Sequence, residues 1–290
     1  MKQVTGFLWM VVTGFLFVGV TATVKHLGGR VPAAEAAFLR YLLGLVFLLP
    51  LLGAIRRTKF DARRMGFFAL RGLIHSVGVI LWFFAMTRIP IAEVTALNYL
   101  SPVYITILAA LFLNETFSWA RGGAILAALI GVVLILRPGF REVGPGHMAM
   151  MGTALLFACS YMIAKVMSDE VSPAVVVAML SVWTTLGLAP AAIAVWVWPT
   201  WDEIGWLFLV ATLATTGHLT MTLAFKSAPI SVTQPVTFLQ LVWATILGWA
   251  VFGEGVDSFV LAGGTIIVGA VVIISFREAR RRPETPPVAP

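Results

Sequence analysis

The chain has 290 residues, of which 60% are apolar and 11% are charged, and its formal net charge is +7. This composition excludes a soluble globular fold, which needs far more polar surface, and the basic residues sit beside the ends of apolar runs and form no stripe of the kind that binds nucleic acid. The single cysteine, Cys159, excludes a disulfide framework and a thiol-based metal site. We therefore expect an all-α polytopic membrane protein with no cofactor and no nucleic-acid partner.

Apolar runs of about 18 to 20 residues, the length that a bilayer core demands, recur from one end of the chain to the other. Charge clusters and Pro or Gly residues divide the chain into ten predicted membrane spans. Their ranges are 6–26, 33–53, 66–87, 92–113, 119–137, 148–167, 174–198, 204–225, 230–252 and 256–276. The tail at residues 277–290 is basic and then proline-rich, which predicts a solvated anchor without a domain of its own.

Basic residues are distributed unevenly between the two sides that these spans define. With both termini in the cytoplasm, 14 of the 20 Lys and Arg residues fall inside, 5 fall outside and one, Arg40, lies within a span. Short cytoplasmic loops carry an excess of Lys and Arg, so this orientation is the expected one. The predicted location is the cell inner (cytoplasmic) membrane, crossed many times, with cytoplasmic N- and C-termini.

The first half of the chain recurs in the second half at an offset of 139 or 140 residues. The stretch "IPIAEVTALNYLSPVYITILAALFLNE" at 89–115 matches "APISVTQPVTFLQLVWATILGWAVFGE" at 228–254. Further matched residues are Thr13, Leu16, Phe17, Lys25, Pro50 and Gly78 in the first copy and Thr153, Leu156, Phe157, Lys165, Pro190 and Gly217 in the second. Because each copy holds five spans, the second copy enters the membrane inverted. We predict two inverted five-helix repeats, residues 1–141 and 142–276.

Inverted repeats give a protein two pseudo-equivalent conformations, one open to each side, as alternating access requires. A resemblance to a known family rests on residues 36–52, "AAFLRYLLGLVFLLPLL", on the paired proline-containing helices, and on the glutamates Glu115 and Glu254 that close them. The chain resembles the EamA branch of the drug/metabolite transporter (DMT) superfamily over roughly residues 6–276. The resemblance implies a secondary carrier whose third, fourth, eighth and ninth spans line a central cavity. It leaves the solute open among amino acids, nucleoside-like metabolites, vitamins and cationic drugs.

Arg40, His75 and His218 are ionisable side chains well inside predicted spans, where such groups are costly and face protein or water. Arg40 in the second span either contacts a carboxylate or phosphate of a solute or holds neighbouring helix carbonyls together. His75 in the third span and His218 in the eighth either hydrogen-bond a solute and exchange a proton or are satisfied interior histidines. Four scattered histidines without nearby acids do not predict a metal site.

Polar and aromatic side chains also interrupt the fourth and ninth spans. Asn98, Tyr99 and Ser101 adjoin Pro102, which frees a backbone carbonyl, as membrane helices tolerate beside a cavity. The remaining candidates for the cavity lining are Gln234, Gln240 and Trp243 in the ninth span, with Trp82 and Tyr161 from neighbouring spans. The set predicts a cavity for a medium-sized, partly aromatic or amphipathic solute, and local stabilisation of helix kinks is the alternative.

Residues near the span ends predict structural roles. We expect Lys25, like its repeat mate, to snorkel to the membrane interface, and Glu254 to cap a turn. Gly123, Ala127 and Gly131 form a ridge of small residues on the fifth span, which predicts close helix packing within the bundle or a dimer contact, so the chain is expected to be a monomer or a weak homodimer.

No GxxxxGK[ST] loop occurs, so direct coupling to ATP hydrolysis is excluded, while proton coupling, exchange and passive equilibration stay open. We predict a secondary transporter for a small organic metabolite, amino-acid-like or aromatic and vitamin-like, with a riboflavin-type uptake carrier as the narrower alternative. A membrane-embedded enzyme would need a clustered acid–base or metal constellation, and a channel would need an open pore. The chain is therefore not expected to be an enzyme, and the direction of transport stays open.

Overall fold

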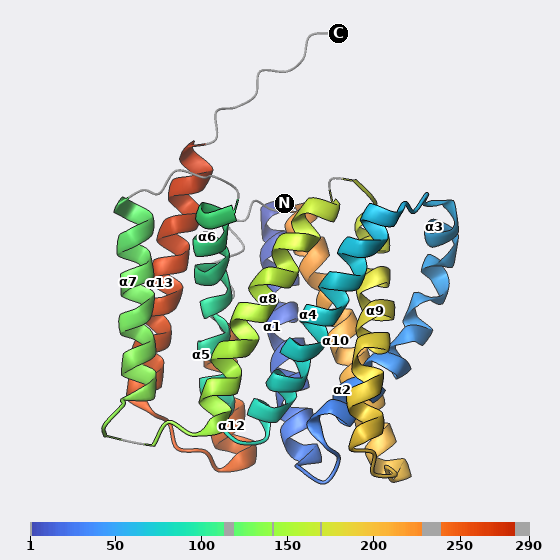
Figure 1. Ribbon diagram of the computed structural model, residues 1–290. Coiled ribbons are helices and arrows are strands. Elements are labelled where there is room, and N and C mark those ends of the chain that lie inside the picture. The colour runs from blue at the N-terminus through green and yellow to red at the C-terminus, as the bar shows by residue number, and fades with distance from the viewer. Residues whose placement is uncertain (1, 113–118, 141, 169, 228–238, 282–290) are drawn as a thin grey trace.

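The computed structural model describes residues 2–112, 119–140, 142–168, 170–227 and 239–281, which form a bundle of helices (Figure 1). In chain order the elements are α1 (Lys2–Leu27), α2 (Ala33–Gly44), the 3-10 helix η1 (Leu45–Leu51), α3 (Leu52–Arg57), α4 (Ala62–Met86), α5 (Ile91–Asn98), α6 (Leu100–Phe112), α7 (Trp119–Leu136), α8 (Pro145–Ser168), α9 (Pro173–Ala194), α10 (Trp201–Ser227), α12 (Leu239–Phe252) and α13 (Ser258–Arg281).

In the described part of the chain, six helical segments are long and apolar enough to cross a membrane by themselves. They are Val4–Leu27, Ala33–Pro50, Ala62–Met86, Pro145–Ala164, Ala174–Ala194 and Trp201–Met221. Shorter apolar helices are Gly122–Leu136, Leu239–Phe252 and Ser258–Ile273, and α5 with α6 forms one interrupted span. The predicted all-α, ten-span membrane fold is confirmed.

Two predicted spans are not the single helices that their apolar length suggested. In the second span, α2 ends at Gly44 and the chain continues as η1, which contains Pro50. In the fourth span, the helix breaks between Asn98 and Leu100. A proline has no N–H for the carbonyl four residues earlier, and for Pro102 that carbonyl belongs to Asn98, so the α-helical ladder is interrupted where the chain breaks.

The two halves of the chain run through the bundle in opposite directions. Figure 1 shows that α1 begins and α13 ends at one end of the bundle, which we call the terminal face. The other end, which carries the loop between α1 and α2, is the distal face. The first helix of the first half, α1, starts at the terminal face, whereas the first helix of the second half, α8, starts at the distal face (Figure 1).

Helix packing is duplicated with the roles of the two halves exchanged. α1 lies along α10, and its counterpart α8 lies along α4. A Cβ added to Gly78 on α4 would lie 2.9 Å from the ring of Phe157 on α8, and one added to Gly217 on α10 would lie 3.4 Å from the ring of Phe17 on α1. Because Gly78 and Gly217, and likewise Phe17 and Phe157, are repeat mates, one helix crossing is built twice. The inverted repeat is confirmed at the level of side-chain packing.

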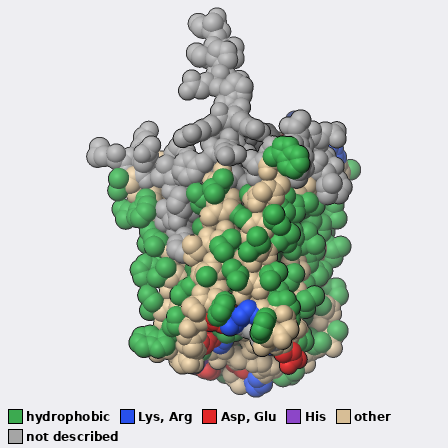
Figure 2. Space-filling model, turned by 90° about the vertical axis from the view of Figure 1, so that its left-hand side faces the viewer, with side chains coloured by type: hydrophobic (Ala, Val, Ile, Leu, Met, Phe, Trp, Pro, Cys, Tyr) green, Lys and Arg blue, Asp and Glu red, His purple; other side chains and the backbone are tan. Residues whose placement is uncertain are grey.

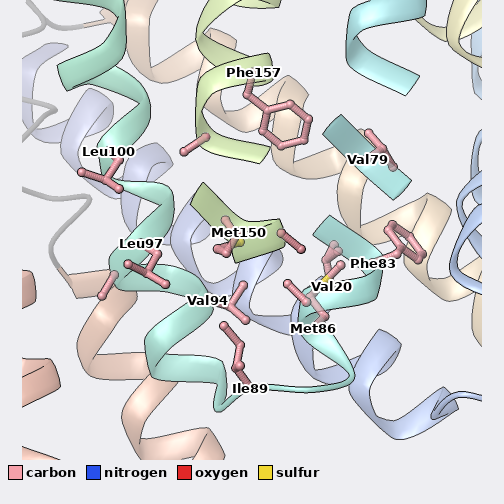
Figure 3. Close-up of a cluster of buried hydrophobic side chains, with 14 of the residues drawn as sticks. Val20, Val79, Phe83, Met86, Ile89, Val94, Leu97, Leu100, Met150 and Phe157 are labelled. Atoms are coloured by element: carbon pink, nitrogen blue, oxygen red, sulfur yellow. The ribbon is translucent and has the colours of Figure 1, made fainter. Parts of the chain in front are cut away.

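The largest cluster of buried apolar side chains lies where α1, α4, α5 and α8 meet (Figure 3). Val20, Phe83, Leu97 and Met150, one from each helix, are all fully buried. Lipid tails are as apolar as these side chains, so close packing holds membrane helices together here. The cluster therefore fixes three helices of the first half against α8 of the second.

Apolar side chains cover the side of the bundle that α7 and α13 form, and charged side chains gather at its distal end (Figure 2). Leu126, Leu129 and Val133 are more than half exposed, as expected where a helix faces lipid. On its other side α7 meets α13 so closely that a Cβ on Gly131 would lie 2.6 Å from the carbonyl oxygen of Gly263. The small-residue ridge predicted on the fifth span is confirmed at Gly131 as packing within the bundle.

Candidate functional site

His75 lies midway along α4 and forms a buried polar group with side chains from α2 and α8. Its Nε2 is 2.9 Å from the hydroxyl of Tyr41, and its Nδ1 is 3.2 Å from the hydroxyl of Ser160. Its ring stacks on Phe157 with 4.7 Å between centroids. A neutral imidazole has one donor and one acceptor, so the two hydroxyls satisfy either tautomer. His75 thus joins the first half of the chain to the second in the middle of the bundle.

Phe157 on α8 gathers further aromatic side chains around this histidine. The ring of Trp82 meets it edge-on at 6.0 Å, and the ring of Tyr161 lies 6.1 Å away. The guanidinium carbon of Arg40 lies 4.1 Å from the ring centroid of Tyr41. The structure therefore groups four predicted site residues, Arg40, His75, Trp82 and Tyr161. Phe157 was not predicted as part of the site, since an apolar ring inside a span carries no chemical signal.

His218 occupies a mirrored environment on α10. Its ring meets Phe17 of α1 edge-on at 5.2 Å, and Phe17 is the repeat mate of the Phe157 on which His75 stacks. Each half therefore places a histidine against the matched phenylalanine, although the two histidines are not repeat mates.

The break between α5 and α6 presents three predicted polar side chains to the interior. The side-chain oxygens of Asn98 and Ser101 are buried and accept or donate no hydrogen bond among the described residues. The hydroxyl of Tyr99 is hydrogen-bonded to the backbone of Leu241 on α12. Tyr99 thus ties the broken fourth span to the ninth.

On α12, two predicted residues pack against α1. Trp243 stacks on Phe15 with 4.4 Å between ring centroids, and its indole Nε1 is buried without a partner among the described residues. Gln240 lies against Gly14, where an added Cβ would be 3.6 Å from the Gln240 Cβ. Gln234 lies outside the described residues. The predicted residues thus form two groups, one around Phe157 and one where α1, the α5–α6 break and α12 meet.

Ion pairs connect the two halves of the chain at the distal face. The pairs are Lys25 with Glu254, Arg30 with Glu203 and Arg137 with Asp257, together with a hydrogen-bonded pair, His147 with Glu93. In every one of these pairs, one partner comes from the first half of the chain and the other from the second. The described part of the distal face is therefore held together by contacts between the repeats.

Lys25 lies at the distal end of α1 and has partners there. Its ammonium group pairs with Glu254 and donates to the carbonyl of Ile89 at 3.0 Å. The second carboxylate oxygen of Glu254 accepts the N–H of Ile91 at 3.0 Å, so this glutamate acts as a cap, as predicted, and the helix that it caps is α5 of the other repeat.

One salt bridge occurs twice with its charges exchanged. Arg30 pairs with Glu203 at the distal face, and Glu170 pairs with Arg63 at the terminal face. Glu170 also pairs with Arg64, with 3.0 Å between its carboxylate and Arg64 Nε. Glu170 follows Arg30 by 140 residues, and Glu203 follows Arg64 by 139 residues, the offset that relates Gly78 to Gly217 on the same two helices, so these are repeat-equivalent positions. Hydrogen bonds from Arg63 and from Arg64 hold the pKa of the Glu170 carboxyl below its ordinary value.

The exchange follows from what each face requires. At the distal face, Glu203 and Thr200 form a capping box, in which the Glu203 carboxylate accepts the Thr200 N–H at 2.7 Å, so the start of α10 favours an acid. At the terminal face, α4 instead begins with basic residues. The loop residue that pairs with each helix start therefore carries the charge opposite to it: Arg30 is basic at the distal face, and Glu170 is acidic at the terminal face.

His147 and Glu93 form a buried pair that sequence reasoning missed. His147 Nε2 is 2.7 Å from the Glu93 carboxylate, and the two residues are only 5% and 2% exposed. The positions equivalent to them in the other repeat are Phe7 and Val232, so the repeat gave no signal. Among the residues that the structure describes, no three His, Cys, Asp or Glu side chains come together as metal ligands.

Comparison with known families matches the description "EamA-like transporter family" twice, over residues 4–137 and 144–276. The chain belongs to this family. As an EamA-like transporter it is a multi-pass membrane protein that carries small metabolites, and it is not an enzyme. A solved crystal structure with 22% sequence identity and a TM-score of 0.57, covering 97% of this chain and 99% of its own, shares the fold.

Several transporters are similar to this EamA-like chain along most of their length. The riboflavin transporter of Rhizobium johnstonii is 30% identical over 290 residues, covering 97% of this chain and 94% of its own. The S-adenosylmethionine uptake transporter of Rickettsia bellii is 27% identical over 256 residues, covering 88% of each chain. The pseudopaline exporter of Pseudomonas aeruginosa is 25% identical over 287 residues, covering 93% of this chain and 96% of its own.

Proposed function

We propose that this protein is a secondary carrier that moves an amino-acid-like or an aromatic, vitamin-like metabolite across the cytoplasmic membrane by alternating access. The proposed site lies between the two repeats and includes the group around Phe157. We further propose that the terminal face is cytoplasmic, because most of the Lys and Arg residues lie on that side of the predicted spans.

The duplicated helix crossing carries this proposal. The Gly78–Phe157 and Gly217–Phe17 contacts give two equivalent packings, one in each half and inverted with respect to the other. A bundle with two such packings can exchange the conformations of its halves, so that the site opens first to one side and then to the other. The distal ion pairs support a state closed at the distal face, since all of them cross between the halves.

Riboflavin is the second candidate solute. The riboflavin transporter of Rhizobium johnstonii is the relative at 30% identity and matches 97% of this chain. The ring of Trp82, together with the stacked pair His75 and Phe157, offers the flat faces on which a tricyclic flavin ring stacks.

Counterflow in proteoliposomes tests the carrier proposal. Vesicles preloaded with unlabelled riboflavin, S-adenosylmethionine or an amino-acid mixture are diluted into the labelled compound, and a carrier for that compound shows transient accumulation above equilibrium. Trp82→Ala should reduce the initial rate several-fold, whereas Leu129→Ala on the lipid-facing side of α7 should not. Flux that rises linearly with concentration without counterflow would show a channel, and a chemically altered product would show an enzyme.

A further inference from the structure

Among the residues that the structure describes, two arginine side chains are buried inside the bundle without a carboxylate partner. Arg40 on α2 is 6% exposed and Arg71 on α4 is 4% exposed. Arg71 donates one hydrogen bond, from Nη1 to the carbonyl of Val176 at 3.0 Å. The Nε and Nη1 groups of Arg40 and the Nε group of Arg71 have no partner in the described part of the protein. Sequence reasoning counted Arg71 among the cytoplasmic charges and missed it as an interior residue.

Both guanidinium groups belong to the surroundings of His75. Arg40 lies over the ring of Tyr41, whose hydroxyl is 2.9 Å from His75 Nε2, and Arg71 precedes His75 by one turn of α4. Since Arg71 also reaches the carbonyl of Val176 on α9, both buried arginines lie between the repeats and do not face the lipid.

The buried and half-buried carboxylates of the described residues are engaged elsewhere. Glu203, Glu254 and Asp257 of the distal face and Glu170 of the terminal face pair with other cations, Glu93 is hydrogen-bonded to His147, and Glu35 accepts the backbone N–H of Val197 at 2.8 Å. Neither Arg40 nor Arg71 forms an ion pair with any carboxylate of the described residues. A buried cation without a counter-charge is costly, and a guanidinium fork matches the geometry of carboxylate and phosphate oxygens.

The repeat shows that the fold does not require these charges. The positions equivalent to Arg40 and Arg71 in the second half are Leu180 and Val210, and both are buried. The same structural places are therefore filled by apolar side chains where the chain carries no arginine.

We infer that Arg40 and Arg71 form an oxyanion-binding site that holds a carboxylate or phosphate group of the transported solute. The inference rests on the proposed carrier function and narrows its substrate class to metabolites that bear an oxyanion. The aromatic side chains of Tyr41 and Phe157 then lie where the body of such a solute would be placed.

Melting of the purified full chain in detergent tests the site. The probes are inorganic phosphate, succinate and riboflavin 5′-phosphate, with riboflavin and sodium chloride of equal ionic strength as controls. We expect the oxyanions to raise the melting temperature above that of the chloride control. Riboflavin 5′-phosphate should stabilise the protein at a concentration at least tenfold lower than riboflavin needs. If none of the oxyanions stabilises the protein beyond chloride, the inference is wrong.

Variants that carry the residue of the other repeat separate binding from folding. Arg40→Leu and Arg71→Val should melt at or above the wild-type temperature without ligand, because each removes an uncompensated charge, and should lose the oxyanion-dependent shift. Arg71→Lys should keep part of that shift, and Arg88→Gln at the distal face should keep all of it. Arginines that only hold helices together would give the reverse: ligand-free destabilisation and an unchanged shift in the surviving variants.

Counterflow distinguishes failure of this site from failure of the carrier proposal. Counterflow of a compound without an oxyanion, unchanged in rate by Arg71→Val, would leave the carrier intact and overturn the oxyanion site. The opposite outcome is also distinguishable. If oxyanions stabilise the protein, the two variants abolish this effect, and none of the tested compounds shows counterflow, the site is supported and the carrier proposal is overturned.

Discussion

Substitution of Gly131 tests one of the close helix contacts in the bundle. In Gly131→Ala the new Cβ would lie 2.6 Å from the carbonyl oxygen of Gly263, whereas ordinary contacts begin at 3.4 Å, so α7 and α13 must separate by about 0.8 Å. Overpacking of this kind costs about 1–3 kcal/mol. The matched control is Gly123→Ala on the same helix, because no atom lies within 4 Å of a Cβ at that position.

Both variants gain the same helix propensity of about 1 kcal/mol, which cancels when they are compared. One kcal/mol corresponds to roughly 2–4 °C in melting temperature for chains near this size, so Gly131→Ala should melt about 2 to 12 °C below Gly123→Ala. Thermal unfolding of both proteins in the same detergent, followed by intrinsic tryptophan fluorescence, measures the difference. If Gly131→Ala melts at or above the control, the close α7–α13 contact does not exist in solution.

Three further predictions follow from the hydrogen bonds and ion pairs. Tyr41→Phe should lower the free energy of unfolding by about 1–3 kcal/mol, because it leaves the buried Nε2 of His75 without a partner, and unchanged thermal stability would contradict that bond. Lys25→Ala should cost about 1.5–3 kcal/mol, and Lys25→Ala combined with Glu254→Gln should cost less than the sum of the two single variants; strict additivity would argue against the ion pair. Because the pKa of Glu170 is lowered in the folded protein, this residue contributes stability above its ordinary pKa of 4.5, and that contribution is lost as the pH falls through the folded value. Glu170→Gln should therefore weaken the fall in melting temperature at acidic pH. An unchanged fall would contradict the terminal-face bridge.

The fold was largely predictable because its main signals are periodic. Apolar length predicted the spans, and the repeat offset paired Gly78 with Gly217 and Phe17 with Phe157, which the structure places in equivalent crossings. The interruption of the second span was not predicted, since the run around Pro50 is apolar throughout and hydropathy does not register a missing hydrogen-bond donor.

The candidate site was predictable only in part. Polar groups inside apolar spans identified Arg40 and His75, because such groups are costly and therefore rare. Arg71 was missed because it lies in the first two turns of the predicted span 66–87. A basic residue so close to the start of a span is expected at the membrane surface. The His147–Glu93 pair was missed because its partners lie 54 residues apart and have no counterparts in the other repeat.

The exchanged salt bridges also determine which halves can pair. In two identical copies of the first half, the contact that Arg30 makes with Glu203 would place Arg30 against a second arginine, and in two copies of the second half it would place Glu203 against a second glutamate. Like charges at one contact raise the free energy of the wrong partnership, as in other proteins that discriminate between partners. The bridge between residues 4–137 and 144–276 therefore favours the pairing of unlike halves and acts as a recognition code between the two halves of one chain.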